Sequence, residues 1–376
     1  MSGPLAGLKV VELAGIGPGP MCAMLLADLG ATVIRIDRKQ PVALGIQRPL
    51  KFNTLLRNRG AIAVDLKDPH AVELVLELVE QADALIEGFR PGVTERLGLG
   101  PDTCLARNPK LVYGRLTGWG QDGPLARHAG HDINYLALTG ILDAIGREGQ
   151  PPSIPLNLLG DYAGGSLYMA VGLLAAVLEA RQSGQGQVVD AAIVDGAAHL
   201  ATTFHGMVAG GIWKSGRGNN ISDSGSHFYD CYECADGRWI AVGPIEEKFF
   251  GLLLDTLGID AASLGPQMSR DHWKSAKATL AARFRTRTRD EWAQLLESSD
   301  ACASPVLSFA EAPMHAHMKA RGTFVELDGI KQAAPAPRFS RTPPPVPTPP
   351  RTASPDSLSG WLPAARIESA RAQGLI

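Results

Sequence analysis

From Leu8 to about Asp195, short apolar runs alternate with longer amphipathic stretches. This alternation is typical of β-α-β units, in which helices cover the faces of a parallel sheet. The apolar runs predict strands at Leu8–Ala14, Thr32–Asp37, Ala84–Glu87 and Leu111–Leu116. The amphipathic stretches predict helices at Pro20–Leu29, from an Asp68 N-cap to about Ala82, and at Asp161–Gln182.

The pattern changes past Gly210, where a Gly- and Ser-rich stretch at 214–218 is typical of a linker. The proline-dense stretch 333–350 favours an extended segment that runs back over the surface. Between them, the sequence predicts a hairpin of His227–Cys234 with Arg238–Val242 and helices at Lys248–Leu257 and Arg289–Leu296.

These elements predict an α/β protein with a Rossmann-like large domain, built on a parallel sheet, and a smaller α+β domain. The expected boundaries are 1–205 for the large domain, 206–225 for a linker, 226–320 for the small domain and 321–376 for a C-terminal return segment and tail that pack on the large domain.

Composition and charge narrow the class of protein. The 376 residues are 45% hydrophobic and 20% charged, as in ordinary soluble proteins, and the net charge of −2 gives no broad basic surface for nucleic acid. No basic stretch followed by an apolar one marks a signal peptide, and the uncharged run 162–178 is short for a membrane span. Five cysteines do not form a disulfide framework, so we expect a cytoplasmic protein without membrane insertion.

Two local motifs imitate cofactor sites. The stretch 15–20 has the glycines of a dinucleotide fingerprint and Asp37 follows at the right distance. However, Pro18 and Pro20 remove two of the backbone N–H groups that would hold a phosphate, so a tight turn into a packed helix is the better interpretation. Cys231 and Cys234 lack a second ligand pair at zinc spacing, so no metal site is expected.

A third constellation favours acid–base chemistry. His131 stands in the stretch 130–135, and Asp161 follows about 30 residues later at the predicted start of the long apolar helix. An N-cap would explain Asp161 and a hydrogen-bonded loop would explain His131, so both structural explanations stay open. A histidine and an aspartate beside a helix N-terminus could also act as two bases around a carbon next to a carbonyl.

Several long motifs, in order along nearly the whole chain, resemble one known family. They include 11–15, 35–38, 89–100, 117–121, 129–135 and 157–165, with further matches at 186–190, 229–237 and 300–302. The chain resembles the α-methylacyl-CoA racemases of the class III CoA-transferase (CaiB/BaiF) superfamily.

The resemblance implies the catalytic residues and the reaction. The family's catalytic histidine and aspartate match His131 and Asp161, and a small-domain glutamate thought to lie near the histidine matches Glu246. One base removes the α-proton of a 2-methylacyl-CoA thioester, an enolate forms, and the other group returns a proton to the opposite face. The family also implies an interlocked homodimer, no metal and no cofactor other than the CoA of the substrate.

The family's CoA contacts match positions in both halves of the large domain. An arginine at position 38 offers a guanidinium fork for a phosphate group. Arg57, Arg90 and Arg96 are weaker candidates. The positions carried over for CoA binding are Arg38, Ala63, Val64, Asp65, Leu66, Arg90, Arg96, Gly130, Asp132, Ile133, Asn134 and Tyr135.

Two other functions compete with racemisation or epimerisation of acyl-CoA thioesters. A class III CoA transferase would use Asp161 as a nucleophile that forms an acyl anhydride and then a thioester. A non-catalytic acyl-CoA-binding homologue would keep the fold without turnover. The sequence leaves the acyl chain, the pathway, the face that each base serves and any residual transferase activity open.

Overall fold

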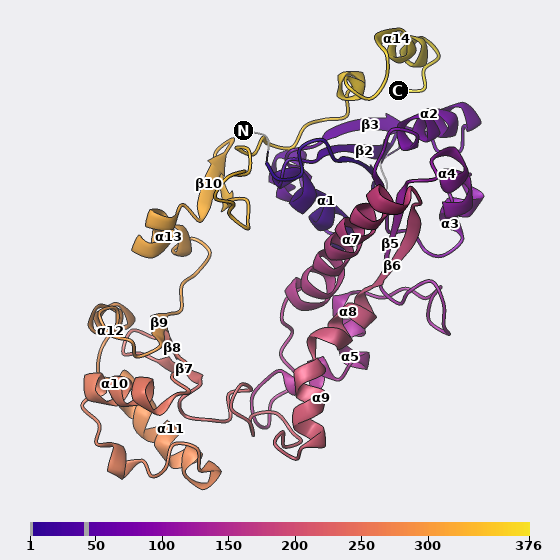
Figure 1. The fold of residues 1–376 in the computed structure, drawn as a ribbon. Helices are drawn as coiled ribbons and strands as arrows, with labels where there is room; N and C mark the ends of the chain where they lie inside the picture. Colours follow the sequence, from indigo (N-terminus) through magenta and orange to yellow (C-terminus); the bar gives the residue numbers. More distant parts are fainter. Residues whose placement is uncertain (1–2, 41–44) are drawn as a thin grey trace. The chain divides into compact units, whose positions relative to one another are not determined.

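The computed structural model describes residues 3–40 and 45–376, and the chain in it divides into two units (Figure 1). The larger unit comprises Met1–Thr139, Leu156–Leu200 and His317–Ile376, and the smaller unit comprises Gly140–Pro155 and Ala201–Ala316.

Two boundaries differ from those predicted: residues 140–155 belong to the smaller unit, and so does the stretch 206–225 that was predicted to be a linker. Ion pairs explain the first difference, because Arg147 binds Asp230 at 2.7 Å and Asp143 binds Arg217 at 2.8 Å.

Six parallel strands form the sheet of the larger unit, which confirms the parallel sheet predicted from the sequence. Their order is β3-β2-β1-β4-β5-β6, so the chain crosses to the other side of β1 after β3. Ligands of such sheets bind beyond the carboxyl ends of the strands at this switch point. The strands are β1 (Lys9–Leu13), β2 (Thr32–Arg38), β3 (Gly60–Val64), β4 (Ala84–Glu87), β5 (Val112–Thr117) and β6 (Gln187–Ala192).

Helices cover both faces of this sheet, because alternate strand residues point to opposite sides. Val10 of β1 packs in the core under α1 (Pro18–Asp28) and α7 (Tyr168–Ser183). Val11, the next residue, packs in the other core, which α2 (Pro69–Val79), α4 (Pro101–Arg107) and α14 (Ala364–Ala372) complete. The predicted Asp68 N-cap is confirmed, since its carboxylate accepts the N–H of His70 at 2.9 Å.

The C-terminal segment runs along the open edge of the sheet. The N–H of Ser354 donates to the carbonyl of Ala61 in β3 at 2.8 Å, and Ser357 Oγ accepts the N–H of Ala61 at 3.1 Å. These bonds satisfy backbone groups that an uncovered edge strand would leave unpaired. The larger unit also contains α3 (Val93–Arg96), α5 (Asp132–Leu138), α8 (Ile193–Leu200) and, around the return segment, α13 (Ala316–Arg321), β10 (Phe324–Leu327) and β11 (Ile330–Ala333).

The long helix of the larger unit begins earlier than predicted. A π-helical stretch, η3 (Leu158–Leu167), precedes α7, so Asp161 lies inside the helix and is not its N-cap. Gly164 of η3 and Gly196 of α8 let the two backbones approach closely, because a Cβ on either would meet the other helix.

Among the described residues, the continuous stretch Leu158–Ser183 is long and apolar enough to cross a membrane by length and composition. It exceeds the 17-residue run considered in the sequence, because the helix includes flanking residues. Half of its most apolar window is buried inside the structure, and core helices of folded proteins pass the same test. The expected cytoplasmic location stays a prediction.

The smaller unit packs helices around an antiparallel sheet in the order β7-β8-β9. Its core centres on Phe228, Phe284 and Trp292, all fully buried. The predicted hairpin is confirmed, but the third strand and the helix α11 were missed. The elements are α6 (Ile141–Ala144), α9 (Thr202–Ala209), β7 (Asp230–Glu233), β8 (Trp239–Val242), α10 (Glu247–Leu257), α11 (Arg270–Phe284), α12 (Arg289–Leu296) and β9 (Ala303–Pro305).

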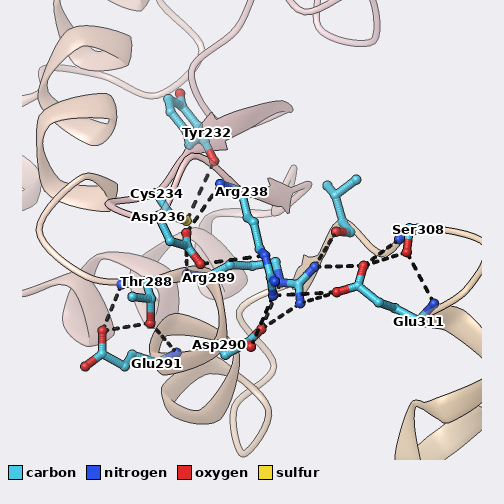
Figure 2. A network of polar contacts seen from close by, with 11 residues as sticks. Tyr232, Cys234, Asp236, Arg238, Thr288, Arg289, Asp290, Glu291, Ser308 and Glu311 are labelled. Atoms are coloured by element: carbon cyan, nitrogen blue, oxygen red, sulfur yellow. Dashed lines mark hydrogen bonds and ion pairs between the residues drawn. The ribbon is translucent and has the colours of Figure 1, made fainter.

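A polar network fastens the start of α12 to the chain beyond β9 (Figure 2). The buried guanidinium of Arg289 donates to Glu311 at 2.9 Å and to the carbonyl of Val306 at 3.1 Å. Thr288 and Glu291 close a capping box at the same helix start. The network holds the segment that leaves the smaller unit against its own core.

We expect Leu85→Ala to lower the free energy of unfolding by about 2–5 kcal/mol, because it leaves a cavity in a core that cannot fully collapse. Leu85 is fully buried in β4 at the centre of the sheet. Denaturant titration followed by circular dichroism measures the change. Val346→Ala is the control, because Val346 is 84% exposed; an equal effect of both substitutions would contradict the assignment of Leu85 to the core.

Candidate active site

A pocket of about 960 Å³ opens beyond the carboxyl ends of the strands in the larger unit. Its walls come from the loop after β1, the ends of β2 and β3, the start of α5 and the first turn of η3. This is the position at which the switch point of the sheet leaves a crevice. All of its lining residues belong to the larger unit.

His131 and Asp161 both line this pocket. His131 is exposed and directly precedes α5, where its backbone N–H donates to Asn134 Oδ1 at 3.0 Å. Asp161 is half-buried in η3, and Asn157 Nδ2 lies 3.5 Å from its Oδ2. The structure therefore brings together the two residues that the sequence singled out for acid–base chemistry.

Asp132 connects these two residues through the backbone. Its buried carboxylate accepts the N–H of Asp161 at 2.7 Å and lies directly against Gly160. A Cβ at position 160 would lie 2.5 Å from Asp132 Oδ2, so only glycine lets the carboxylate come this close. Because Asp132 directly follows His131, this contact ties the backbone beside His131 to the backbone of Asp161.

The surroundings of Asp161 raise its pKa to about 6. Burial is the main cause, because it disfavours the charged form, and the nearby carboxylate of Asp132 adds a like charge. The hydrogen bond from Asn157 and the proximity of His131 oppose the rise. An acid with a pKa near neutrality can both take up and release a proton under ordinary conditions.

Gly17 brings the start of α1 to Asp161. Its φ of +65° suits glycine, and a Cβ there would lie 3.2 Å from Asp161 Oδ2. The glycine-rich stretch that imitated a dinucleotide fingerprint is therefore a turn that places a helix N-terminus beside a carboxylate. The positive end of the α1 dipole faces the pocket at this point.

The predicted CoA-binding positions fall into two groups. Arg38, Ala63 and Asp132 line the pocket, and the Arg38 guanidinium also lies 5.5 Å from the ring centroid of Phe89. The others do not line it: they are Val64, Asp65, Leu66, Arg90, Arg96, Gly130, Ile133, Asn134 and Tyr135.

Several of these positions have clear structural roles. Val64 is fully buried in the sheet, as the last residue of β3. Tyr135 is buried and packs edge-to-face on Trp119 at 4.7 Å. Asp65 Oδ1 accepts the N–H of Lys67 at 3.0 Å in a turn.

Arg57, a weaker candidate for CoA binding, does not line the pocket either. It is buried, and its Nε donates to Asp28 at 3.1 Å, so it is part of the core and not of the pocket.

Arg35 and Arg48 also line the pocket and were not predicted. With Arg38 they place three guanidinium groups at one pocket, and arginine is well suited to phosphate. Arg35 lies 2.8 Å from Asp37. The signal in the sequence was the excess of basic residues between 35 and 51, where Asp37 is the one acidic residue. No site residue was predicted at positions 41–44, which lie outside the described ranges.

Glu246 lies in the smaller unit, where it directly precedes α10. Its predicted position near His131 therefore stays a prediction. Within residues 3–40 and 45–376, no group of three or more His, Cys, Asp or Glu side chains gathers as a metal site would require.

Comparison with known proteins identifies relatives along nearly the whole chain. A model of CoA-transferase family III matches residues 5–356. The α-methylacyl-CoA racemase of Mus musculus is 46% identical over 341 residues, and that of Homo sapiens is 43% identical over 340; each match covers 90% of this chain and 87% of the relative. A crystal structure of a CaiB/BaiF family protein from Brucella suis has a TM-score of 0.82 at 27% identity and covers 98% of this chain and 100% of that one.

We expect Asp132→Asn to lower the pKa of Asp161 from about 6 toward its ordinary value of 3.8, because the substitution removes a like charge but keeps an oxygen that can accept the same N–H group. A ¹³C NMR titration of the Asp161 carboxyl measures the change. Asp102→Asn, an exposed position on α4, is the control. An unchanged titration of Asp161 in Asp132→Asn would show that the two charges do not interact.

Proposed function

Because the chain belongs to CoA-transferase family III, we propose that it interconverts the enantiomers or epimers of 2-methylacyl-CoA thioesters at the α-carbon. The observation that carries this proposal is the shared pocket of His131 and Asp161, joined through Asp132. The racemases at 43–46% identity support it, and they make the chain an isomerase rather than a binding protein.

The two candidate bases allow a balanced proton transfer. The Asp161 carboxylate takes the α-proton from one face, and the electron pair of the broken C–H bond delocalises into the thioester carbonyl as an enolate. The imidazolium of His131 then gives its proton to the opposite face, which leaves a neutral imidazole and a protonated Asp161. The reverse reaction starts from that state, and a pKa of about 6 makes both states of Asp161 accessible.

The enolate oxygen needs a positive environment. The N–H of Asp161 cannot supply it, because that group already donates to Asp132. We propose that the N-terminus of the 11-residue helix α1 supplies it instead, through the helix dipole and the N–H of Gly19, since Pro18 and Pro20 have no N–H and Gly17 brings this end of the helix to Asp161. The thioester carbonyl itself accepts the charge, so independence of metals and cofactors stays our prediction.

The CoA moiety would place its phosphates on the arginines of the pocket. Arg35, Arg38 and Arg48 come from β2 and the loop after it, on one side of the pocket, while His131 and Asp161 come from α5 and η3. Guanidinium groups bind phosphate through two parallel hydrogen bonds. This arrangement separates a charged end for the CoA from a reactive end for the acyl group.

Isotope exchange tests the reaction. In deuterated buffer, a 2-methylacyl-CoA should exchange its α-hydrogen, and Asp161→Asn or His131→Ala should each lower racemisation by about 10²- to 10⁴-fold, since each removes one of two proton carriers. Proton NMR of the α-position and chiral analysis measure both. Exchange measured on each enantiomer separately shows which face each base serves. Each variant keeps only one base, and that base can remove the α-proton of only one enantiomer.

Asp102→Asn is the matched control and should leave the rate unchanged. Transfer of CoA to a free carboxylic acid without exchange at the α-carbon would replace racemisation with the transferase reaction, in which Asp161 is a nucleophile. Tight binding of acyl-CoA without either reaction would identify a non-catalytic homologue.

We further propose that two copies of the chain associate. Leu167, Val171 and Leu178 follow one another along one side of the helix from η3 through α7, and 45–68% of each is exposed. An exposed apolar stripe of this kind is typical of a protein interface. A second copy is the occupant that the family implies, and in such a dimer Glu246 of one copy could approach the pocket of the other.

Val171→Glu is expected to convert the dimer into a monomer, because it buries a charge in an apolar interface. Light scattering coupled to size-exclusion chromatography measures the mass, which should fall from twice 39.8 kDa to 39.8 kDa. Gln373→Glu, an exposed position directly after α14 and away from this stripe, adds the same charge and should remain dimeric. A monomeric unmodified protein would contradict the proposal.

A further inference from the structure

The smaller unit has a basic pocket of its own, with a volume of about 670 Å³. Five cationic side chains line it: Arg147, Lys214 and, from α11, Arg270, Lys274 and Lys277. Glu148 is the one acidic side chain in the lining. The concentration of charge is local, because the whole chain carries a net charge of −2.

One buried carboxylate compensates part of this charge. Asp230 is 8% exposed and forms ion pairs of 2.7 Å with both Arg147 and Lys277. A second buried carboxylate, Asp223, accepts the backbone N–H groups of Asn220 and Gly225 and therefore stabilises the loop beside the pocket. Five cations against Glu148 and Asp230 leave three positive charges without a carboxylate partner.

The fold holds Arg270 in place without neutralising it. Its guanidinium donates to the carbonyls of Asn219 at 2.8 Å and Ile212 at 2.9 Å, and it lies 5.4 Å from the ring centroid of Trp273. Lys277 is similarly held, because its ammonium also donates to the carbonyl of Ser224. These side chains have lost most of their freedom before any ligand arrives, which lowers the entropic cost of binding one.

Lys214 and Lys274 differ from the other three cations. In the described part of the chain, their ammonium groups form no hydrogen bond and no ion pair. Arg270 and Lys274 are four residues apart on α11, where like charges are neighbours and destabilise a helix. An anion in the pocket would remove this repulsion and give both lysines a partner.

We propose that this pocket binds the phosphate groups of a small molecule, of the pyrophosphate or phosphate-monoester class. The volume suits a small ligand, and the concave shape favours a compact anion over a polymer. Trp273 is 6% exposed and its ring centroid lies 5.4 Å from the Arg270 guanidinium, so the aromatic ring in the lining is largely covered and the charged groups are what the pocket presents to a ligand. The pocket shares no residue with the proposed active site, and its assignment does not rest on the proposed racemase activity.

Titration of the full-length chain with inorganic pyrophosphate, followed by calorimetry, tests the proposal. We expect saturable binding that weakens as salt is added, because the attraction is between charges. The variant Lys214→Glu/Lys274→Glu should bind pyrophosphate at least about tenfold more weakly, since it reverses two charges that have no other partner. Lys110→Glu/Lys319→Glu makes the same change at two exposed lysines outside the pocket and should bind as the unmodified chain does.

Competition experiments distinguish the sources of the phosphate. If CoA and pyrophosphate compete and the Lys214→Glu/Lys274→Glu variant loses both, the pocket binds the phosphates of CoA. If CoA binds the variant normally and pyrophosphate does not, the ligand is a separate phosphorylated molecule. The absence of saturable pyrophosphate binding, equal binding by the pocket and control variants, or binding of a polyanion such as an oligonucleotide in place of pyrophosphate would each overturn the proposal.

Discussion

The contact of the Asp132 carboxylate with the backbone of Gly160 and Asp161 is the constraint on which the candidate site depends. It joins the start of α5 to the first turn of η3, two elements that are about 30 residues apart in the sequence. The same carboxylate sets the electrostatics, because its charge helps to raise the pKa of Asp161. One side chain thus helps to position the candidate acid and adds to a rise in its pKa that burial mainly causes.

The elements around this contact are held by close backbone packing. Gly164 and Gly196 let η3 and α8 meet, and Gly17 lets the start of α1 approach the Asp161 carboxylate. A larger side chain at any of these positions would push an element away from the pocket. The site therefore depends on the absence of side chains as much as on their chemistry, and a rigid sheet behind it keeps these distances fixed.

Regular patterns predicted much of the fold, and tertiary contacts decided the rest. Alternating apolar runs and the Asp68 N-cap predicted β1, β2, β4, β5 and α2, because each is a local signal. The same reasoning placed Asp161 at a helix start, whereas the close contact between Gly164 and Gly196 belongs to a π-helical stretch that begins three residues earlier. His131 and Asp161, which the sequence singled out as a pair, line one pocket, but Arg48 and the hydrogen bond from the Asp161 N–H to Asp132 were not predicted, because neither leaves a periodic trace.

The raised pKa of Asp161 also has a cost in stability. An acid whose pKa is higher in the folded protein than in the unfolded chain binds protons more tightly when folded, so its contribution to stability falls as the pH rises from its ordinary value of 3.8 to about 6. Above that range the folded protein holds a carboxylate that burial and Asp132 disfavour. The cations on α11 in the basic pocket of the smaller unit also have a cost in stability, because they repel one another. A fold gains nothing in stability from either arrangement, so both mark places where binding or chemistry, rather than packing, accounts for the residues present.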